Sequence, residues 1–393
     1  MKTILDLELK NKVALVRVDF NVPIEDGVIT DNLRIVSAIP TIEHLIKKGA
    51  KVILCSHLGR PKGVAQKEFS LEVVGVELSK LMKMNVVFSD DDEVVSQKTL
   101  ELVEHFKGTD DKILLLQNTR FVSGEKKNDL DFARKLATLA DIFVLDAFGT
   151  AHRAHSSTVG VAEFIPAYGG FLMEKEIKYL LDFLEEPERP FTIVMGGAKV
   201  SDKITLIENL LKKADNIVIG GAMANTFLKA QGYDTGASKV EEDNLDIALD
   251  TLKLAKERGV NIYLPTDIVG ATEFSNDTAV DTYEISSIPK NVMALDIGAK
   301  TIEEYCSVIK NSKTVVFNGP MGVFELSNYE KGTKALVEAM ATFGGVSIAC
   351  GGDSAASVKQ FGFSDKFTHV STGGGASLEL LEGKELPGIK IVK

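Results

Sequence analysis

The chain has 393 residues, of which 45% are hydrophobic and 26% charged, a composition typical of globular proteins with sizeable cores. A single core seldom serves more than about 250 to 300 residues, so we expect two domains. The net charge of −11 argues against general binding to nucleic acid or to anionic membranes, because the field of the whole chain would repel phosphate groups.

The cysteines and the first residues of the chain bear on its compartment. Cys55, Cys306 and Cys350 form no C-x-x-C pair, and an odd number of cysteines cannot all pair within one chain. Residues 1–12 mix acidic and apolar side chains, and no run of about 18 apolar residues occurs anywhere. We therefore expect a reduced, soluble, cytoplasmic protein.

Short apolar runs alternate with longer segments of helical period in the first part of the chain, which is the pattern of a parallel sheet with crossover helices. The expected strands are VALVRV (13–18), KVILC (51–55), NVVF (85–88), ILLL (113–116) and IFVL (142–145).

A long helix is expected next, over residues 171–186. Five Leu and Ile residues between positions 172 and 184 recur near helical spacing, and Pro187 and Pro190 would end the helix. A second series of expected strands follows: FTIVM (191–195), NIVIG (216–220), VNIYL (260–264), TVVF (314–317) and VSIA (346–349). The predicted fold class is α/β, with two lobes that are each a parallel-sheet, Rossmann-like α/β sandwich, joined by this helix.

In open parallel sheets, ligands bind beyond the carboxyl ends of the strands. Three of the eight arginines stand at such ends in the first series, and Arg34 follows closely behind the first of these strands. Surface salt bridges would explain any one arginine, but several at successive strand ends favour a site for a small, multiply anionic ligand. The polar residues at these ends are Asp19, Asn21, His57, Arg60, Arg120, His152, Arg153 and His155.

The second series is followed by glycine-rich stretches instead: GGAKVSDK, GGAMAN, NGPMGVFE and CGGDS. Each pair of glycines alone is explained by a tight turn, but together they let a backbone approach a phosphate or a flat base closely. Lys199 and Lys203 supply positive charge, and Asp353 could hold Mg²⁺ as a hard oxygen ligand. This half of the chain therefore favours a nucleotide.

Gly373, Gly374 and Gly375 stand directly before a stretch with helical spacing of leucines. The N-terminus of such a helix exposes free N–H groups and the positive end of the helix dipole. A lobe for an anion, a lobe for a nucleotide and a helix N-terminus suited to a phosphoryl group together indicate phosphoryl transfer, which depends on positioning and charge stabilisation.

Other enzyme classes lack their motifs. Neither G-x-x-x-x-G-K-[ST] nor G-x-G-x-x-G occurs, protein-kinase signatures are missing, and no G-x-S-x-G elbow supports a hydrolase. A nicotinamide-dependent dehydrogenase on two α/β lobes thus loses its main support. A two-lobed periplasmic-type binding protein would need a signal segment, which the sequence does not offer.

Over essentially its whole length the chain resembles the phosphoglycerate kinase family. The motifs RVDFNVP, SHLGRPKG, DAFGTAHRAHSSTVG, GGAKVSDKI, NGPMGVFE, GGDS and STGGGASLELLEGKELPG occur in that family's order and spacing. The resemblance implies a glycolytic kinase that transfers a phosphoryl group reversibly from 1,3-bisphosphoglycerate to ADP, giving 3-phosphoglycerate and ATP, with hinge bending. Another two-lobed, nucleotide-dependent phosphotransferase of small molecules is the alternative.

The resemblance also implies roles for particular residues. In the N-terminal lobe, Arg34 would face the reacting carboxyl, and the residues that would bind phosphoglycerate are Asp19, Asn21, Arg34, His57, Leu58, Gly59, Arg60, Arg120 and Arg153. The substrate carboxylate is itself the nucleophile and is ionised at neutral pH, so no side-chain general base is needed. His152 and His155 are left open between a binding and a structural role.

On the nucleotide side, the resemblance assigns Lys199, Lys203 and Asn318 to the phosphates and Glu325 to the ribose. Gly351, Gly352, Asp353 and Ser354 would carry the Mg-nucleotide, with Asp353 as the metal ligand, and Gly373, Gly374 and Gly375 would donate N–H groups to the moving phosphoryl group. Two departures lie near the expected base pocket: Ala222 stands where many relatives have glycine, and Ala299 where proline is common.

The expected domain limits follow from these assignments. Residues 1–170 would form the phosphoglycerate-binding domain, together with a C-terminal return over residues 376–393. Residues 171–186 would be the interdomain helix, and residues 187–375 the nucleotide-binding domain. We expect a monomer that binds neither nucleic acid nor membrane.

Overall fold

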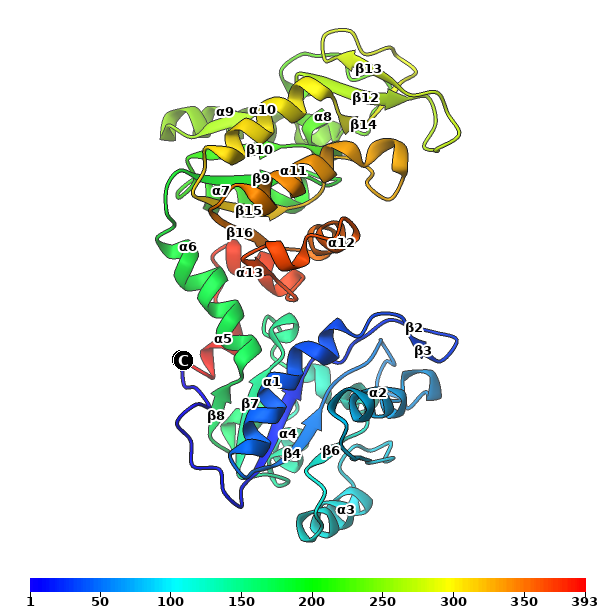
Figure 1. Ribbon diagram of the computed structural model, residues 1–393, viewed down its shortest axis with the longest axis vertical. Coiled ribbons are helices and arrows are strands. Elements are labelled where there is room, and N and C mark those ends of the chain that lie inside the picture. The colour runs from blue at the N-terminus through cyan, green and yellow to red at the C-terminus, as the bar shows by residue number, and fades with distance from the viewer. The chain divides into compact units, whose positions relative to one another are not determined.

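The computed structural model describes the backbone of residues 1–393 and every side chain except that of Phe183. It divides into two compact units, and each is described by itself. The first unit comprises Met1–Lys178 and Glu385–Lys393, coloured blue to green with a short red segment in Figure 1. The second unit is Tyr179–Lys384, coloured green to red.

The first unit is built on a six-stranded sheet in the order β5-β6-β4-β1-β7-β8, and every pair in it is parallel. All six residues of β1 are buried, as expected for a central strand that is covered on both faces. The strands are β1 (Val13–Val18), β4 (Lys51–Cys55), β5 (Val86–Phe88), β6 (Ile113–Leu115), β7 (Ile142–Asp146) and β8 (Ala167–Gly169).

Helices cover this sheet, and their sequences explain where they begin and which face they bury. In α1 (Leu33–Lys47), Ile35, Ala38, Ile42 and Leu45 recur at helical spacing and are buried in the core beside β1 and β4. Side-chain caps start two others, since Ser96 accepts a hydrogen bond at the start of α3 and Asp129 at the start of α4. The remaining helices are α2 (Glu72–Met82), α3 (Gln97–Gly108), α4 (Leu130–Ala137), α5 (Phe171–Ile177) and α14 (Pro387–Lys390).

The second unit repeats this plan with a six-stranded parallel sheet in the order β11-β10-β9-β15-β16-β17. Its strands are β9 (Phe191–Met195), β10 (Asn216–Ile219), β11 (Asn261–Tyr263), β15 (Thr314–Asn318), β16 (Val346–Ala349) and β17 (His369–Val370). Its helices are α6 (Phe183–Glu185), α7 (Ile204–Leu210), α8 (Gly221–Ala230), α9 (Leu245–Arg258), α10 (Ala299–Lys310), α11 (Lys331–Thr342), α12 (Gly352–Gln360) and α13 (Gly375–Leu381).

The α/β fold with two parallel sheets is confirmed, and the sequence patterns missed only smaller elements. The sheet edges gain the short strands β8 and β17, and the first unit has a hairpin of β2 (Ile24–Glu25) and β3 (Val28–Ile29). The second unit has a separate antiparallel sheet, β13-β12-β14. Its strands are β12 (Asp267–Ala271), β13 (Asp281–Glu284) and β14 (Met293–Ile297).

The stretch expected as a helix over residues 171–186 is helical from Phe171 to Glu185, but its helix type changes along the chain. The α-helical segment α5 ends at Ile177, a π-helical turn spans Lys178–Asp182, and α6 follows. The boundary between the compact units falls within this stretch, after Lys178, and the chain rejoins the first unit at Glu385. There, Val392 accepts a backbone hydrogen bond from Lys2, and Gly388 donates one to Ala151.

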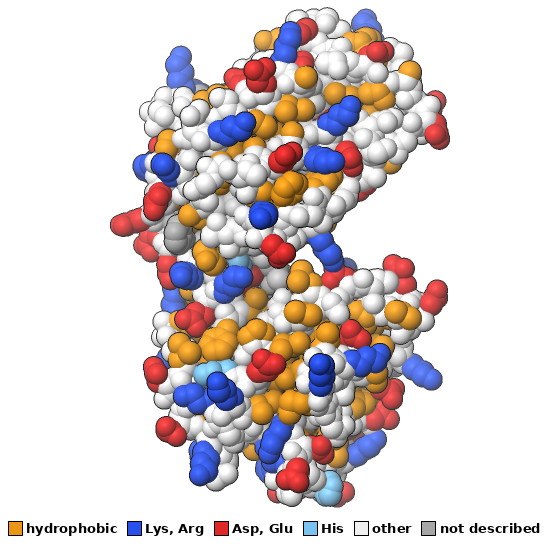
Figure 2. Space-filling view, viewed as in Figure 1, with side chains coloured by type: hydrophobic (Ala, Val, Ile, Leu, Met, Phe, Trp, Pro, Cys, Tyr) orange, Lys and Arg blue, Asp and Glu red, His pale blue; other side chains and the backbone are white. Residues whose placement is uncertain are grey.

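The surface of each unit carries charges of both signs. On the face drawn in Figure 2, Lys and Arg side chains are interspersed with Asp and Glu rather than separated from them. Among the residues described, no helix is long and apolar enough to span a bilayer.

Candidate active site

The polar residues expected to hold phosphoglycerate follow neighbouring strands of the first sheet. Asp19 and Asn21 come after β1, His57 after β4, Arg120 after β6 and Arg153 after β7. These four strands are adjacent and parallel, so their carboxyl ends meet at one edge of the sheet. The positive charge of Arg120 reaches both Arg153 and His57, which supports their proximity.

Arg34 reaches the same edge from the first turn of α1. Its Nη1 donates a hydrogen bond to Oδ2 of Asp19 over 2.6 Å, in an ion pair that leaves 35% of the Arg34 side chain and 9% of the Asp19 side chain exposed. One carboxylate therefore orients Arg34 while much of the guanidinium stays accessible to a ligand. Arg60 is also exposed, directly after the loop that follows β4.

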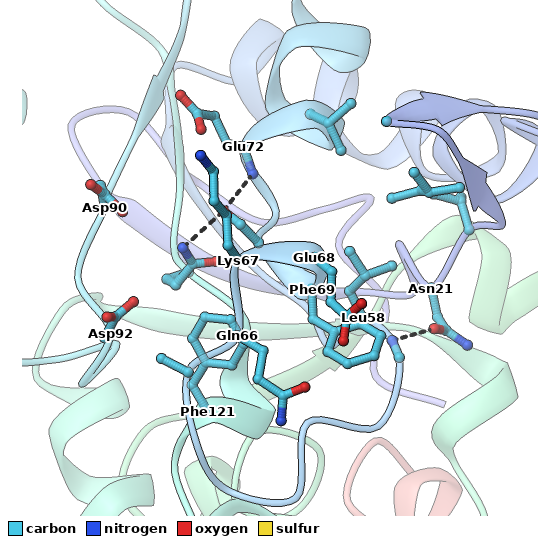
Figure 3. Close-up of a pocket in the computed structure, with 18 of the residues that line it drawn as sticks. Asn21, Leu58, Gln66, Lys67, Glu68, Phe69, Glu72, Asp90, Asp92 and Phe121 are labelled. Atoms are coloured by element: carbon cyan, nitrogen blue, oxygen red, sulfur yellow. Dashed lines mark hydrogen bonds between the residues drawn. The ribbon is translucent and has the colours of Figure 1, made fainter.

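The loop after β4 is held from both sides. Oδ1 of Asn21 accepts a hydrogen bond from the backbone N–H of Gly59 at 2.8 Å, drawn dashed in Figure 3. Nη1 of Arg120 donates to the carbonyl of Gly59 at 2.7 Å, and the buried Asn118 binds both backbone groups of Leu58. The loop is thus fixed by its own site residues before any ligand arrives.

Behind this loop lies a cavity of about 750 Å³, shown in Figure 3. Phe69 and Leu58 lie close together on its wall, and carboxylates outnumber cations in its lining. Asn21, Leu58 and Gly59 contribute to this lining, but none of the strand-end arginines does, so the cavity lies beside the arginine cluster. The charged lining residues are Asp26, Glu68, Glu72, Asp90, Asp92 and Lys67.

Positive charge at the strand ends is only partly compensated. Burial and the charges of Arg17 and Arg153 lower the pKa of Arg120 to about 10, and its Nε is buried with no hydrogen-bond partner among the described residues. Burial, together with neighbouring arginines, lowers the pKa of His155 to about 4 and that of His57 well below its usual range. An entering anion would relieve this repulsion, so the edge is chemically suited to phosphate and carboxylate groups.

His152 and His155 differ in their surroundings. His155 is buried, and its Nδ1 has no hydrogen-bond partner among the described residues. His152 is partly buried and accepts a hydrogen bond at Nε2 from Nε of Arg153 over 3.0 Å. His152 therefore orients an arginine of the cluster, whereas His155 lies within it as a neutral ring.

The second unit offers a cavity of about 400 Å³ at the carboxyl ends of its sheet. Gly221 shows why glycine is required there: its φ is +67°, and a Cβ would lie 2.6 Å from the backbone nitrogen of Gly197. Ala222 lines the cavity, whereas Ala299 is the first residue of α10. The polar and small lining residues are Gly197, Ala198, Gly221, Ala222, Ala224, Asn225, Lys239, Ala294, Asp296, Gly322, Glu325 and Asp353.

Lys203 and Asn318 bind protein groups beneath the glycine turns. Nζ of Lys203 donates to the carbonyl of Gly196 at 2.6 Å and to both oxygens of Asn318 at 2.7 Å. Nδ2 of Asn318 donates to the carbonyl of Cys350 at 3.0 Å. These contacts use all three protons of the ammonium and tie the ends of β9, β15 and β16 together. Burial lowers the pKa of Lys203 to about 8.

Lys199 lies exposed in the loop after β9, and Glu241 fixes this loop. Oε2 of Glu241 accepts hydrogen bonds from the backbone N–H groups of Val200 at 2.6 Å and Ser201 at 3.1 Å, and Oε1 accepts one from the Ser201 hydroxyl at 2.6 Å. The loop is therefore held in place while the Lys199 ammonium stays accessible.

At the start of α12, Gly351 is the N-cap and Asp353 lies exposed in the first turn. Ser354 is buried, and its Oγ accepts a hydrogen bond from Gly319 N at 2.7 Å. No group of three or more His, Cys, Asp or Glu side chains suited to a metal occurs among the described residues. A single exposed carboxylate fits Mg²⁺ that is carried largely by nucleotide phosphates, as this ion commonly is.

Gly374 is the N-cap of α13 and has φ +52° and ψ −114°, a conformation that side chains rarely adopt. The N–H of the buried Gly373 donates to Oγ of Ser371 at 3.0 Å, and Gly375 is exposed at the first position of the helix. The backbone conformation at Gly374 therefore favours glycine at the start of this helix.

Four polar residues around the two sites did not emerge from the sequence patterns: Arg17, Glu125, Ser157 and Glu241. Arg17 is completely buried within β1, where the sequence shows one arginine in an otherwise apolar run. An arginine inside a buried apolar strand must have polar partners, so this position could have predicted a buried charge network. Glu241 had none, because it contacts a loop 40 positions away.

Comparison with known proteins gives a consistent result. The family model described as phosphoglycerate kinase matches residues 4–384. The phosphoglycerate kinase of Clostridium novyi is 56% identical over 389 residues, covering 99% of this chain and 97% of the relative, and that of Clostridium perfringens is 55% identical at the same coverage.

Solved structures agree with the sequence comparison. The phosphoglycerate kinase of Coxiella burnetii is 43% identical with a TM-score of 0.89, covering 99% of this chain and 98% of that one. The enzyme of Pyrococcus horikoshii is 33% identical with a TM-score of 0.84, covering 100% and 98%. No finding favours a different phosphotransferase, so the chain belongs to the phosphoglycerate kinase family and is a glycolytic kinase.

Proposed function

We propose that the two ligands of the kinase reaction bind on different units. The basic strand ends of the first unit hold 3-phosphoglycerate or 1,3-bisphosphoglycerate, and the glycine-lined cavity of the second unit holds ADP or ATP. The observation that carries this division is electrostatic. Arg120 and its neighbours are crowded cations in need of an anion, whereas the second cavity has no arginine in its lining and offers closely approaching glycine backbone, with Asp353 in the first turn of α12.

In the first unit, Arg60, Arg120, Arg153 and His57 bind the phosphate and carboxyl oxygens of the substrate. Asn21 and Arg120 hold the Leu58–Gly59 loop in the shape needed for this contact. Because Asp19 fixes one nitrogen of Arg34, the rest of that guanidinium is oriented toward the reacting carboxyl. A preorganised cation there stabilises the carboxylate as it gains or loses the phosphoryl group.

The proton balance needs no side-chain base. In the ATP-forming direction, a β-phosphate oxygen of ADP attacks the acyl phosphate and the substrate carboxylate leaves as an anion. In the reverse direction the same carboxylate is the nucleophile, already ionised at neutral pH. Buried histidines with lowered pKa values, such as His57 and His155, are accordingly neutral donors or spacers rather than proton carriers.

In the second unit, Lys199 approaches the nucleotide phosphates and Glu325 the ribose. Lys203 and Asn318 contribute mainly by fixing the glycine turns, since their polar atoms are already engaged. Asp353, beside Gly351, Gly352 and Ser354, would hold Mg²⁺ on the phosphates. When bound, the ion would neutralise charge on the nucleotide. The N–H groups of Gly374 and Gly375 would face the moving phosphoryl group, whereas that of Gly373 already donates to Ser371.

Ligands on different units can react only when the units approach, so we propose hinge closure at the two connections, near Lys178 and Lys384. Closure also excludes water that would hydrolyse the acyl phosphate. Small-angle scattering should show a smaller radius of gyration with both ligands than with either alone. It should also show a 42.6 kDa monomer. An unchanged radius would contradict closure.

Calorimetry with one ligand at a time tests the division. Arg60→Gln should weaken 3-phosphoglycerate binding about tenfold or more and leave Mg-ADP binding within about twofold, as expected for losing a charged contact. The control is Arg134→Gln. Arg134 lies on α4, where its guanidinium stacks over the Phe164 ring, so its loss should affect the binding of neither ligand. Equal weakening of both ligands by Arg60→Gln would contradict the proposal.

A further inference from the structure

A buried row of polar side chains runs behind the phosphoglycerate residues of the first unit. Its members are Glu125, Ser157, Arg17 and His57, and at most 4% of any of them is exposed. The Ser157 hydroxyl donates to Oε1 of Glu125, and its oxygen accepts a hydrogen bond from Nε of Arg17 at 2.9 Å. Nη2 of Arg17 then lies 3.1 Å from Nδ1 of His57. Of these four residues, only His57 belongs to the proposed substrate site.

The glutamate end of the row is firmly anchored. Besides the Ser157 hydroxyl, Glu125 accepts hydrogen bonds from the Ser157 backbone N–H at 3.0 Å and from the Thr119 hydroxyl at 3.2 Å. Since the one hydroxyl proton of Ser157 goes to the carboxylate, the Ser157 oxygen can only accept from Arg17. Every donor and acceptor along the row is therefore assigned in one direction.

This direction settles which ring nitrogen of His57 carries the proton. A guanidinium has five N–H donors and no acceptor, so Nδ1 of His57 must accept from Arg17 and cannot itself be protonated. The competing partner of Nδ1 is Oδ1 of Asp19, which lies 3.8 Å away, beyond hydrogen-bond distance. The neutral ring must then carry its proton on Nε2.

We propose that Arg17 is a positioning residue: the row of Glu125, Ser157 and Arg17 holds neutral His57 as the Nε2–H tautomer, so that His57 donates a hydrogen bond to an anionic oxygen of phosphoglycerate. The inference rests on the proposed role of His57 as a substrate ligand. In the other tautomer, Nε2 would present a lone pair to the anion and repel it.

The surroundings of His57 keep the ring neutral. Burial is the main cause of the lowered pKa of His57, and the positive charges of the neighbouring arginines lower this pKa further. Asp19 is the counter-charge, at 3.8 Å. A neutral donor costs less to bury than an imidazolium and still supplies a directed N–H. The titratable and charged groups that face the ring are Arg17, Asp19, Arg34, Arg120 and His155.

The direct test measures the tautomer in the unaltered enzyme by ¹⁵N-edited NMR of histidine side chains. The chain has six histidines, and the resonances lost in His57→Gln identify residue 57. We expect a neutral ring with the proton on Nε2 between about pH 6 and 8, throughout the usual histidine range. A proton on Nδ1, or a doubly protonated ring at pH 7, would overturn the inference.

A variant pair tests whether the row acts through His57. Ser157→Ala removes the hydroxyl that accepts the hydrogen bond from Nε of Arg17. Ser156→Ala removes the neighbouring hydroxyl, which donates to the carbonyls of Gly124 and Asp129 and has no hydrogen bond with Arg17 or His57. Ser157→Ala should raise KM for 3-phosphoglycerate about 3- to 10-fold, as for one weakened hydrogen bond, and give a mixed tautomer at an unchanged KM for ATP. Ser156→Ala should change neither.

The outcomes separate the inference from the function on which it rests. If Ser157→Ala lowers only the melting temperature and otherwise behaves like Ser156→Ala, the row is structural and the inference is wrong. If His57→Gln leaves KM for 3-phosphoglycerate unchanged, the substrate role of His57 fails, and the inference fails with it. A proton on Nδ1 together with a raised KM in His57→Gln would overturn the inference alone.

Discussion

Replacing Arg34 with alanine should separate catalysis from stability. The structure gives Arg34 one protein contact of consequence, its 2.6 Å ion pair with Asp19, and 35% of the arginine side chain is exposed. At that exposure, loss of the pair should cost at most about 1 kcal/mol of folding free energy. Loss of a preorganised cation at the reacting carboxyl should raise the activation free energy by roughly 3 kcal/mol. This corresponds to a fall in kcat of about 150-fold.

The assay couples ATP use to the formation of 1,3-bisphosphoglycerate and yields kcat and both KM values. Thermal unfolding and Mg-ADP calorimetry, done alongside, should be close to those of the unaltered enzyme. Arg34→Lys keeps a charge but loses the planar fork, so we expect it to fall between the two. Arg134→Ala serves as the control for removing an arginine from the same unit. A kcat of Arg34→Ala within about threefold of the original would refute the role of Arg34.

Three further predictions follow from individual residues. Asp353→Ala should raise KM for Mg-nucleotide about tenfold or more and leave phosphoglycerate affinity unchanged; equal weakening of both would indicate a folding defect. Gly374→Val should lower kcat by about two decades and cost about 1 to 2 kcal/mol of stability, because its φ of +52° disfavours any side chain; normal turnover in a variant that melts early would make the glycine purely structural. Burial raises the pKa of Asp146 from 3.8 to about 7, so the folded state binds a proton that the unfolded chain releases, and the unfolding free energy falls as pH rises through this window. Denaturant titrations from pH 4 to 7 measure this decrease. In Asp146→Asn the unfolding free energy should fall less steeply with pH, by at most about 1.4 kcal/mol per pH unit. An unchanged slope would contradict the raised pKa of Asp146.

Much of the fold was predictable because both sheets are parallel and buried. Strands such as β1 and β9 are continuous apolar runs, and their sequences differ clearly from the helices between them. The sheet of β12, β13 and β14 was not predictable in this way. The sequence of β13 is DTYE, which is mostly exposed and stabilised by pairing with β12 rather than by an apolar pattern of its own.

The candidate sites were predictable as sets of residues but not as networks. An arginine directly after a strand indicates an anion site. The local sequence, however, does not indicate that Asp19 binds Arg34, or that the ammonium of Lys203 donates all three protons to Gly196 and Asn318. Such pairings depend on the register and order of strands far apart in the chain. The π-helical turn after α5 could not be predicted from the sequence either, because its leucines continue the α-helical spacing of apolar residues.

The most direct test of the account mixes the purified chain with 1,3-bisphosphoglycerate and Mg-ADP and follows ATP, 3-phosphoglycerate and inorganic phosphate together. If the units close over both ligands and exclude water, ATP and 3-phosphoglycerate should form in equal amounts, with no release of inorganic phosphate above the uncatalysed rate. Enzyme-dependent release of inorganic phosphate, or failure to form ATP, would contradict it.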